Sequence, residues 1–321
     1  MKQLKILLIL LLAAFISACS NDDTYEPKTP DIPRVEGREG DALIWRVTSD
    51  TATIYLVGTI HIGNEDLYPM QQVLLDAFYR SDALAVEFDL VSFERDVQAQ
   101  LRMIDKMMLE DTTVKDHLSP ETFALLESYL EGRNAIERSI LLGMRVGALT
   151  MTLMQEYMME WGWFETRGVD QFFLDLAHEL GMKIIEVESP ESQMEMLFGF
   201  SDELNELQLR EILDATEEDI EKYFNEEMNR MLNIWINGDA DALRELLDET
   251  NREMERENPR LFEEYNTAMM INRDIAMAAR IVEMLAGNQT IFFAVGAAHM
   301  VAENGIIELL TEKGWTVERV R

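Results

Sequence analysis

Two short apolar segments that each end in Gly-x-x-His constrain the fold of this chain more than any other feature. Residues 52–63 read ATIYLVGTIHIG and carry His61, and residues 290–299 read TIFFAVGAAH and end at His299. Short runs rich in β-branched and aromatic residues are typical of strands that are covered on both faces of a sheet. We expect Gly58 to let the backbone turn sharply after the first run. Each histidine is therefore predicted to project beyond the end of a buried strand.

Two further apolar runs end in carboxylates. Residues 83–86 are followed by Glu87, and residues 183–187 are followed by Glu188. Helical patterns separate these strands, which predicts parallel neighbours whose carboxyl ends share one edge of the sheet. Open α/β sheets bind their ligands at that edge. The side chains expected to converge there are those of His61, Glu87, Glu188 and His299.

The order of these segments predicts an α/β fold with a mainly parallel central sheet and flanking helices. The chain has 321 residues and no linker rich in proline, glycine or serine in its middle, which favours one domain over residues 41–321. Its first helix is expected at 69–80, with proline in the first turn. Large helical insertions are expected at about 91–162 and 190–286. The first is rich in methionine and aromatic residues, which is typical of an adaptable core; a lid over the sheet edge is the alternative.

The first 40 residues resemble those of an exported bacterial lipoprotein. Residues 1–18 combine a lysine-bearing start with an apolar stretch too short to span a bilayer, which indicates a signal peptide. The sequence Ile-Ser-Ala-Cys at 16–19 resembles a lipobox, in which Cys19 would carry lipid; an ordinary signal peptide with an incidental cysteine is the alternative. Residues 19–40 read as a flexible tether. We expect membrane anchoring on the periplasmic face or the cell surface.

Composition argues against several classes of function. The 61 acidic and 28 basic residues give a formal net charge of −33, whereas nucleic-acid binding needs a basic surface, so we expect no nucleic-acid partner. Cys19 is the only cysteine, which leaves no intramolecular disulfide and no other thiol nucleophile. The chain lacks a Gly-x-Ser-x-Gly elbow and an HExxH helix, so a hydrolase site must be assembled from distant segments. His117 and His178 follow no strand, and we leave them out of the site.

Several further motifs lie between and around the two Gly-x-x-His sequences. They are Leu67-Tyr68-Pro69, Val86-Glu87, Gly168-Val169-Asp170, Glu188 with Glu191 and Gln193, Arg273, and VGAAHMVAENGIIELL at 295–310. In this order and spacing they resemble the TraB/GumN family, which includes the TIKI proteases that inactivate Wnt. The resemblance covers about 43–320. Two positions depart from the family pattern: Asp274 follows Arg273 where the family usually has asparagine, and Val187 replaces the leucine that commonly precedes the acid.

The resemblance carries expectations about fold and activity. It implies an α/β core similar to that of erythromycin esterases and haem-binding ChaN proteins, with helical insertions. It also implies metal-dependent peptidase activity, because the TIKI members are metal-dependent peptidases. The motif residues expected to support the metal ligands are Gly58, Gly296, Asp170 and Gln193.

Two imidazoles with one or two carboxylates suit a divalent transition metal such as manganese, cobalt or zinc. Such a metal, with one position open, would lower the pKa of a bound water and polarise the carbonyl under attack. We assign His61 and His299 as ligands, and Glu87 and Glu188 as ligand and general base in either order. Arg273 would stabilise an oxyanion or orient a carboxylate. The competing interpretation is that the glycines only shape turns and the histidines bond to neighbouring loops.

Three functions follow as hypotheses. The first is a membrane-anchored metallohydrolase that acts on a peptide or protein substrate. The second is a lipoprotein that binds haem, a metal or a glycan in the same place without turnover. The third is an accessory role in surface polysaccharide production, suggested only by the context that gave GumN its name. The acidic surface would favour cationic peptides and raise the local metal concentration.

Overall fold

The computed structural model of the chain describes residues 34–321. The expected signal peptide at 1–18, the lipidation residue Cys19 and the expected tether up to residue 33 lie outside the described residues. Within the described part, no helix has both the length and the apolar character that are needed to cross a membrane.

The core is a six-stranded sheet with the strand order β4-β3-β5-β2-β1-β6. Strands β2, β5, β3 and β4 run parallel; β1 pairs antiparallel with β2, and β6 pairs antiparallel with β1 at the edge of the sheet. The α/β class with a mainly parallel central sheet is therefore confirmed. The strands are β1 (Ile44–Thr48), β2 (Thr53–Thr59), β3 (Ala83–Val86), β4 (Lys183–Glu186), β5 (Thr290–Gly296) and β6 (Val317–Arg319).

Strand β5 lies between β2 and β3, although it is encoded near the end of the chain. Thr59 of β2 lies opposite Gly296 of β5, and Val86 of β3 lies opposite Ala294. The carboxyl ends of these three strands therefore meet at one edge. All four residues of β3 are buried, which agrees with a strand that is covered on both faces.

Two helices cover one face of the sheet through an aromatic cluster. Phe78 of α1 (Gln72–Tyr79) and Phe173 of α7 (Val169–Leu180) pack on Phe292 of β5, with ring centroids 5.4 and 4.7 Å from it. All three rings are fully buried, and each buried side chain of this size contributes about 1.5–3 kcal/mol of hydrophobic free energy. Helix α1 begins at Gln72, so the expected start at 69 is wrong.

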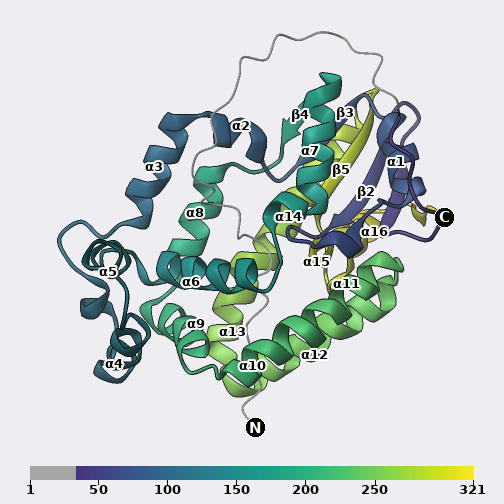
Figure 1. Cartoon of the computed structure of the whole chain (residues 1–321). Helices are drawn as coiled ribbons and strands as arrows, with labels where there is room; N and C mark the ends of the chain where they lie inside the picture. Colours follow the sequence, from purple (N-terminus) through teal and green to yellow (C-terminus); the bar gives the residue numbers. More distant parts are fainter. Residues whose placement is uncertain (1–33) are drawn as a thin grey trace.

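The two helical insertions extend to one side of the sheet and below it in the view of Figure 1. They also pack on each other, because α6 contacts both α8 and α9. The first insertion comprises α2 (Leu90–Arg95), α3 (Val97–Met107), α4 (Pro120–Tyr129), α5 (Ala135–Leu142) and α6 (Val146–Glu160). The second comprises α8 (Pro190–Phe198), α9 (Asp202–Leu213), α10 (Glu217–Lys222), α11 (Asn229–Ile236), α12 (Ala240–Glu257), α13 (Pro259–Asn266) and α14 (Asn272–Leu285).

The ends of the helices near the sheet follow local signals. Ser189 caps α8, with its side chain accepting a hydrogen bond from the backbone of Ser192, and Pro190 occupies the first helical position. Gly181 ends α7 with a φ of 62°, a left-handed conformation that suits glycine. After β5 the chain forms α15 (Ala297–Val301) and α16 (Ile306–Glu312).

Candidate functional site

The two Gly-x-x-His segments lie side by side at the carboxyl edge of the sheet. Parallel pairing of β2 with β5 sets Gly58 opposite Val295 and Thr59 opposite Gly296. A Cβ atom on Gly58 would come within 2.9 Å of the Cα atom of Ala297, so this close approach requires glycine. Gly58 lies within the extended strand β2, and the expected sharp turn at this residue is wrong. Its role is to let the two segments touch.

Asp170, at the start of α7, fixes the His61 ring. Nδ1 of His61 lies 2.8 Å from Oδ2 of Asp170 and donates to it, because an ionised carboxylate only accepts. The hydroxyl of Thr59 donates to the other oxygen of Asp170. The backbone of α7 is held close as well, since a Cβ atom on Gly168 would lie 2.3 Å from the carbonyl oxygen of His61. The motif Gly168-Val169-Asp170 thus packs directly on the first histidine.

Asp274 fixes the ring of the second histidine in the same way. Nδ1 of His299 lies 2.6 Å from Oδ1 of Asp274 on α14. Both side chains are buried, with His299 fully so. The sequence interpretation missed this role, although it marked Asp274 as the residue that departs from the family pattern next to Arg273.

The outer nitrogen of each imidazole lacks a hydrogen-bond partner in the described part of the chain. Nε2 of His61 and Nε2 of His299 are both buried and make no hydrogen bond with any described residue. A buried polar atom without a partner costs free energy, and such atoms call for an explanation. Metal-binding histidines commonly donate Nδ1–H to a carboxylate and leave Nε2 for the metal. Both histidines have this arrangement.

A network of charged groups holds the Glu87 carboxylate beside the histidines. Oε1 of Glu87 accepts from the Gly296 backbone at 3.0 Å and lies 3.7 Å from Nε2 of His61. Oε2 accepts from Arg273 at 2.7 Å and from Gln193 at 3.0 Å. Gly296 therefore binds this carboxylate through its N–H group, and Gln193 binds it through its amide.

Glu188 lies beside Glu87, because the same nitrogen of Arg273 and the amide of Gln193 each donate to both carboxylates. Its two oxygens each accept one hydrogen bond from the guanidinium, both at 2.8 Å, and Gln193 donates to it at 2.7 Å. The remaining nitrogen of Arg273 donates to the carbonyl of Met269 at 3.3 Å. Arg273 thus binds the carboxylates of both Glu87 and Glu188, which is compatible with the expected role of orienting a carboxylate, and its role at an oxyanion stays a prediction.

The electrostatics of the site favour positive charge near Glu87. Burial lowers the pKa of His61, but the carboxylates of Asp170 and Glu87 outweigh it and raise this pKa to about 9. Burial raises the pKa of Glu87, but Arg273 and the histidines outweigh it and lower this pKa to about 2. Glu87 is thus an ionised carboxylate in a dry environment, and its surroundings attract a proton or a cation.

The structure brings the four predicted residues into one network. Glu87 interacts electrostatically with both His61 and His299. Glu188 makes its ion pair with Arg273 and is linked to Glu87 through both Arg273 and Gln193. Among residues 34–321, no group of three or more His, Cys, Asp or Glu side chains is arranged closely enough to form a ready-made metal site.

Two other histidines lie elsewhere. Nε2 of His178 on α7 bonds to the carboxylate of Asp89, 2.9 Å from Oδ1, and Nε2 of His117 lies 3.2 Å from the Thr112 hydroxyl. Neither is among the residues that surround Glu87, in agreement with their exclusion from the predicted site.

The residues around Glu87 fit a divalent transition metal in their chemistry. Two unpartnered imidazole nitrogens and an ionised carboxylate oxygen are the ligand types that zinc, manganese and cobalt accept. The carboxylates of Asp170 and Asp274 would orient the imidazoles and raise their basicity as ligands. By ligand type, the candidate donors are therefore His61, His299 and Glu87, which do not form a ready-made metal site among residues 34–321.

Comparison with known proteins gives one match. The sequence model of the TraB/PrgY/gumN family matches residues 43–319, which include every strand of the sheet and every residue of the site. No curated protein and no solved structure shows significant similarity to the chain.

Proposed function

Because this chain belongs to the TraB/PrgY/gumN family, we propose that it is a metal-dependent hydrolase that cleaves peptides at the edge of its sheet. The observation that carries the proposal is the pair of buried Nε2 atoms without hydrogen-bond partners. They belong to histidines whose Nδ1 atoms are held by carboxylates and which both interact with the ionised Glu87. Packing alone does not account for two such atoms in one place, since each costs free energy when it is left unpaired.

The proposal gives each residue a role. His61, His299 and Glu87 hold a divalent ion of manganese, cobalt or zinc. Arg273 keeps Glu87 ionised and oriented, because its buried guanidinium donates to that carboxylate. Glu188 also helps to balance the positive charge of Arg273, from which it accepts two hydrogen bonds.

The geometry favours one of the two assignments for the glutamates. Oε1 of Glu87 lies 3.7 Å from Nε2 of His61, whereas the side chain of Glu188 bonds to Arg273 and Gln193. We therefore propose Glu87 as the ligand and Glu188 as the acceptor of a proton from the attacking water. A divalent ion at this place would supply Lewis acidity, lowering the pKa of a water and polarising the carbonyl of the substrate.

Metal analysis of purified protein tests the site before any substrate is known. After equilibration with manganese, cobalt or zinc and removal of free metal, we expect elemental analysis to find about one ion per chain. The variants His61→Ala and His299→Ala should each lose it. His117→Ala is the matched control, because that histidine lies outside the site, and it should keep the ion. Full metal content in both site variants would refute the assignment.

Activity is tested on a mixture of peptides that is analysed by mass spectrometry. We expect cleavage by the metal-loaded protein, none after chelation, and none by either site variant. Metal binding without any cleavage would instead favour the non-catalytic alternative, a binding protein.

The membrane anchor remains a proposal that rests on the sequence alone. We propose that Cys19 carries lipid and tethers the domain outside the cytoplasm, on the periplasmic face or the cell surface. Labelling of cells with a fatty-acid analogue should mark the wild-type chain and leave Cys19→Ala unmarked.

A further inference from the structure

A pocket with a volume of about 80 Å³ opens beside His61 at the edge of the sheet. Part of its wall consists of the residues between glycine and histidine in the two motifs: Thr59 and Ile60 in the first, Ala297 and Ala298 in the second. A water molecule needs only about 10–15 Å³ of such space. The pocket therefore has room for a side chain next to the proposed metal ligands.

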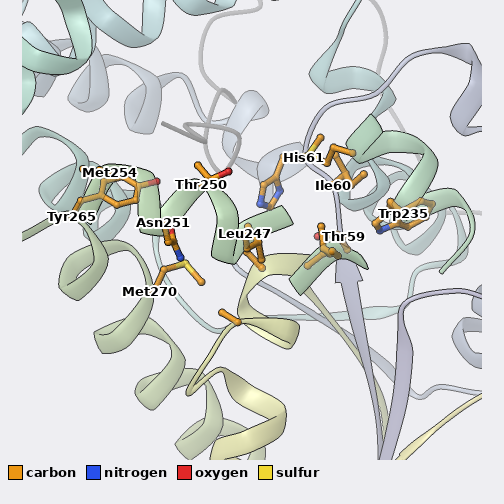
Figure 2. A pocket seen from close by; sticks show the side chains of 15 residues that line it. Thr59, Ile60, His61, Trp235, Leu247, Thr250, Asn251, Met254, Tyr265 and Met270 are labelled. Carbon is orange, nitrogen blue, oxygen red and sulfur yellow. The ribbon is translucent and has the colours of Figure 1, made fainter. Parts of the chain in front are cut away.

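Helices α11 and α12 and the segment after α13 form the opposite wall. Figure 2 shows Leu247 and Thr250 of α12 near the His61 ring, with Met254, Tyr265 and Met270 farther along the same cavity. Trp235 of α11 is fixed at the other end, because its indole N–H donates to the carbonyl of Gly58 at 2.8 Å. The hydrogen bond of Trp235 thus connects the wall of the pocket to the first Gly-x-x-His segment, in addition to direct contact.

The lining is almost entirely apolar and carries no formal charge besides the ring of His61. No aspartate, glutamate, lysine or arginine of the described chain lines it, although the sequence has 89 such residues, 61 acidic and 28 basic. Three of the lining residues are methionines: Met231, Met254 and Met270. Methionine side chains are flexible and adapt to partners of different shape.

Two half-buried polar side chains line the pocket. Thr250 and Asn251 are neither fully buried nor fully exposed. The Thr250 hydroxyl donates to the Leu246 carbonyl at 3.1 Å and keeps its acceptor capacity, and the Asn251 amide is both donor and acceptor, as the backbone of an extended peptide requires. Apolar walls with a few polar groups are typical of a binding pocket.

We propose that this pocket binds an uncharged, apolar side chain of the peptide, such as leucine, methionine or phenylalanine, beside the bond that is cleaved. This inference rests on the proposed function. Apolar surface gains about 25 cal/mol per Å² when it leaves water. A charged side chain would lose its hydration and meet only one charged group in the wall, the ring of His61, which already pairs with Asp170 and Glu87. The residues between glycine and histidine in both motifs would then select the substrate.

The binding test uses small probes and protein from which metal has been removed. The probes are the N-acetyl methylamides of leucine, methionine, phenylalanine, glutamate and lysine, and ligand-observed NMR measures their dissociation constants. We expect the three apolar probes to bind at least five times more tightly than the two charged ones. Because no metal is present, this result does not depend on hydrolysis.

Two variants fill the pocket from opposite sides. Ala298→Leu and Met270→Trp should each weaken binding of the apolar probes at least fivefold. Both starting residues are half-buried, so the larger side chains can be accommodated without rebuilding the core. The matched control is Ala279→Leu, at an exposed position of α14 outside the pocket, which should bind the probes as the wild type does.

The outcomes separate this inference from the proposed function. Binding of apolar probes that both filling variants lose, in a protein that cleaves no peptide, supports the pocket and refutes the hydrolase. Cleavage with equal kcat/KM for apolar and charged side chains refutes the pocket and leaves the hydrolase standing. Failure of every apolar probe to bind, or equal binding to folded Ala298→Leu and Met270→Trp, would also overturn the inference.

Discussion

Asp274 holds His299 as Asp170 holds His61, with a carboxylate oxygen 2.6 Å from Nδ1 in the first pair and 2.8 Å in the second. The two aspartates come from different helices, α14 and α7. The opposite nitrogen of His61 lies 3.7 Å from Oε1 of Glu87, and His299 interacts electrostatically with the same carboxylate. The two pairs therefore form the same chemical unit twice, at the ends of neighbouring strands.

Substitution of Asp274 should weaken metal binding in a graded way. Asp274→Asn keeps an oxygen that accepts from Nδ1–H and should have the smaller effect, whereas Asp274→Ala removes the acceptor and should lower metal affinity by about 10–100-fold. Competition with a chelating dye measures both. Asp202→Ala is the matched control, because Asp202 pairs with His117 away from the site. Unchanged affinity in Asp274→Ala would contradict the orienting role.

Removal of the Arg273 side chain should destabilise the fold strongly. Arg273→Met leaves the buried Glu87 without its cation, and the loss of one partner of a buried ion pair costs about 3–5 kcal/mol. Arg273→Lys keeps the charge but cannot form the paired hydrogen bonds to Glu188, so it should recover only part of the loss. Urea denaturation measures the free energy of unfolding. Arg280→Met, which breaks an exposed pair on the same helix, should cost no more than about 1 kcal/mol.

An alanine at position 58 should separate the two motif segments. The added Cβ atom would meet the backbone of Ala297 at 2.9 Å, and relief of such overpacking typically costs about 1–3 kcal/mol. We expect a lower melting temperature together with weaker metal binding. In the control Gly143→Ala, the nearest atom is the flexible tip of Met108, and the change should stay below about 1 kcal/mol. A stable Gly58→Ala with normal metal binding would show that the close approach is dispensable.

The acid sensitivity of the fold should depend in part on Glu206, which ties α9 to the start of α4. Burial raises the pKa of this carboxyl, but hydrogen bonds from Ser119 and Thr122 outweigh it, so the pKa lies below its usual value. The ionised form then stabilises the fold above the ordinary pKa of about 4.3, and this contribution is lost as the pH falls through the lowered pKa.

Glu206→Gln tests this dependence. The variant should be less stable than the wild type at about pH 7, and the difference should shrink as the pH falls below about 4. Urea denaturation across this range measures it. A difference that stays constant with pH would show that the charge of Glu206 contributes nothing.

The strands and helix ends near the site were predictable because their signals are local. The run of apolar residues before Glu87 became β3, and Ser189 with Pro190 began α8, since burial on both faces and N-capping act within a few residues of sequence. The family motifs then indicated which residues belong to one site. The sequence also showed that two of the four parallel strands are followed closely by a histidine.

The partners within the site depend on tertiary packing and were not predictable in the same way. Asp274 is one acidic residue among 61, and only the position of α14 beside α15 shows that it bonds to His299. Glu188 follows its strand as expected, but no local pattern reveals that Arg273 and Gln193 bind it together with Glu87. The sequence interpretation of Gly58 was a sharp turn. Glycine is required there because the backbone approaches Ala297, which comes from the other end of the chain.

Strand β5 occupies the middle of the sheet although it is made almost last. Until residues 290–296 are in place, β2 and β3 have an open gap between them, and Glu87 has neither the Gly296 N–H nor His299 beside it. An unfinished chain leaving the ribosome therefore lacks a complete candidate site around Glu87. The order of synthesis would therefore prevent the proposed hydrolase activity until nearly the whole polypeptide has been made.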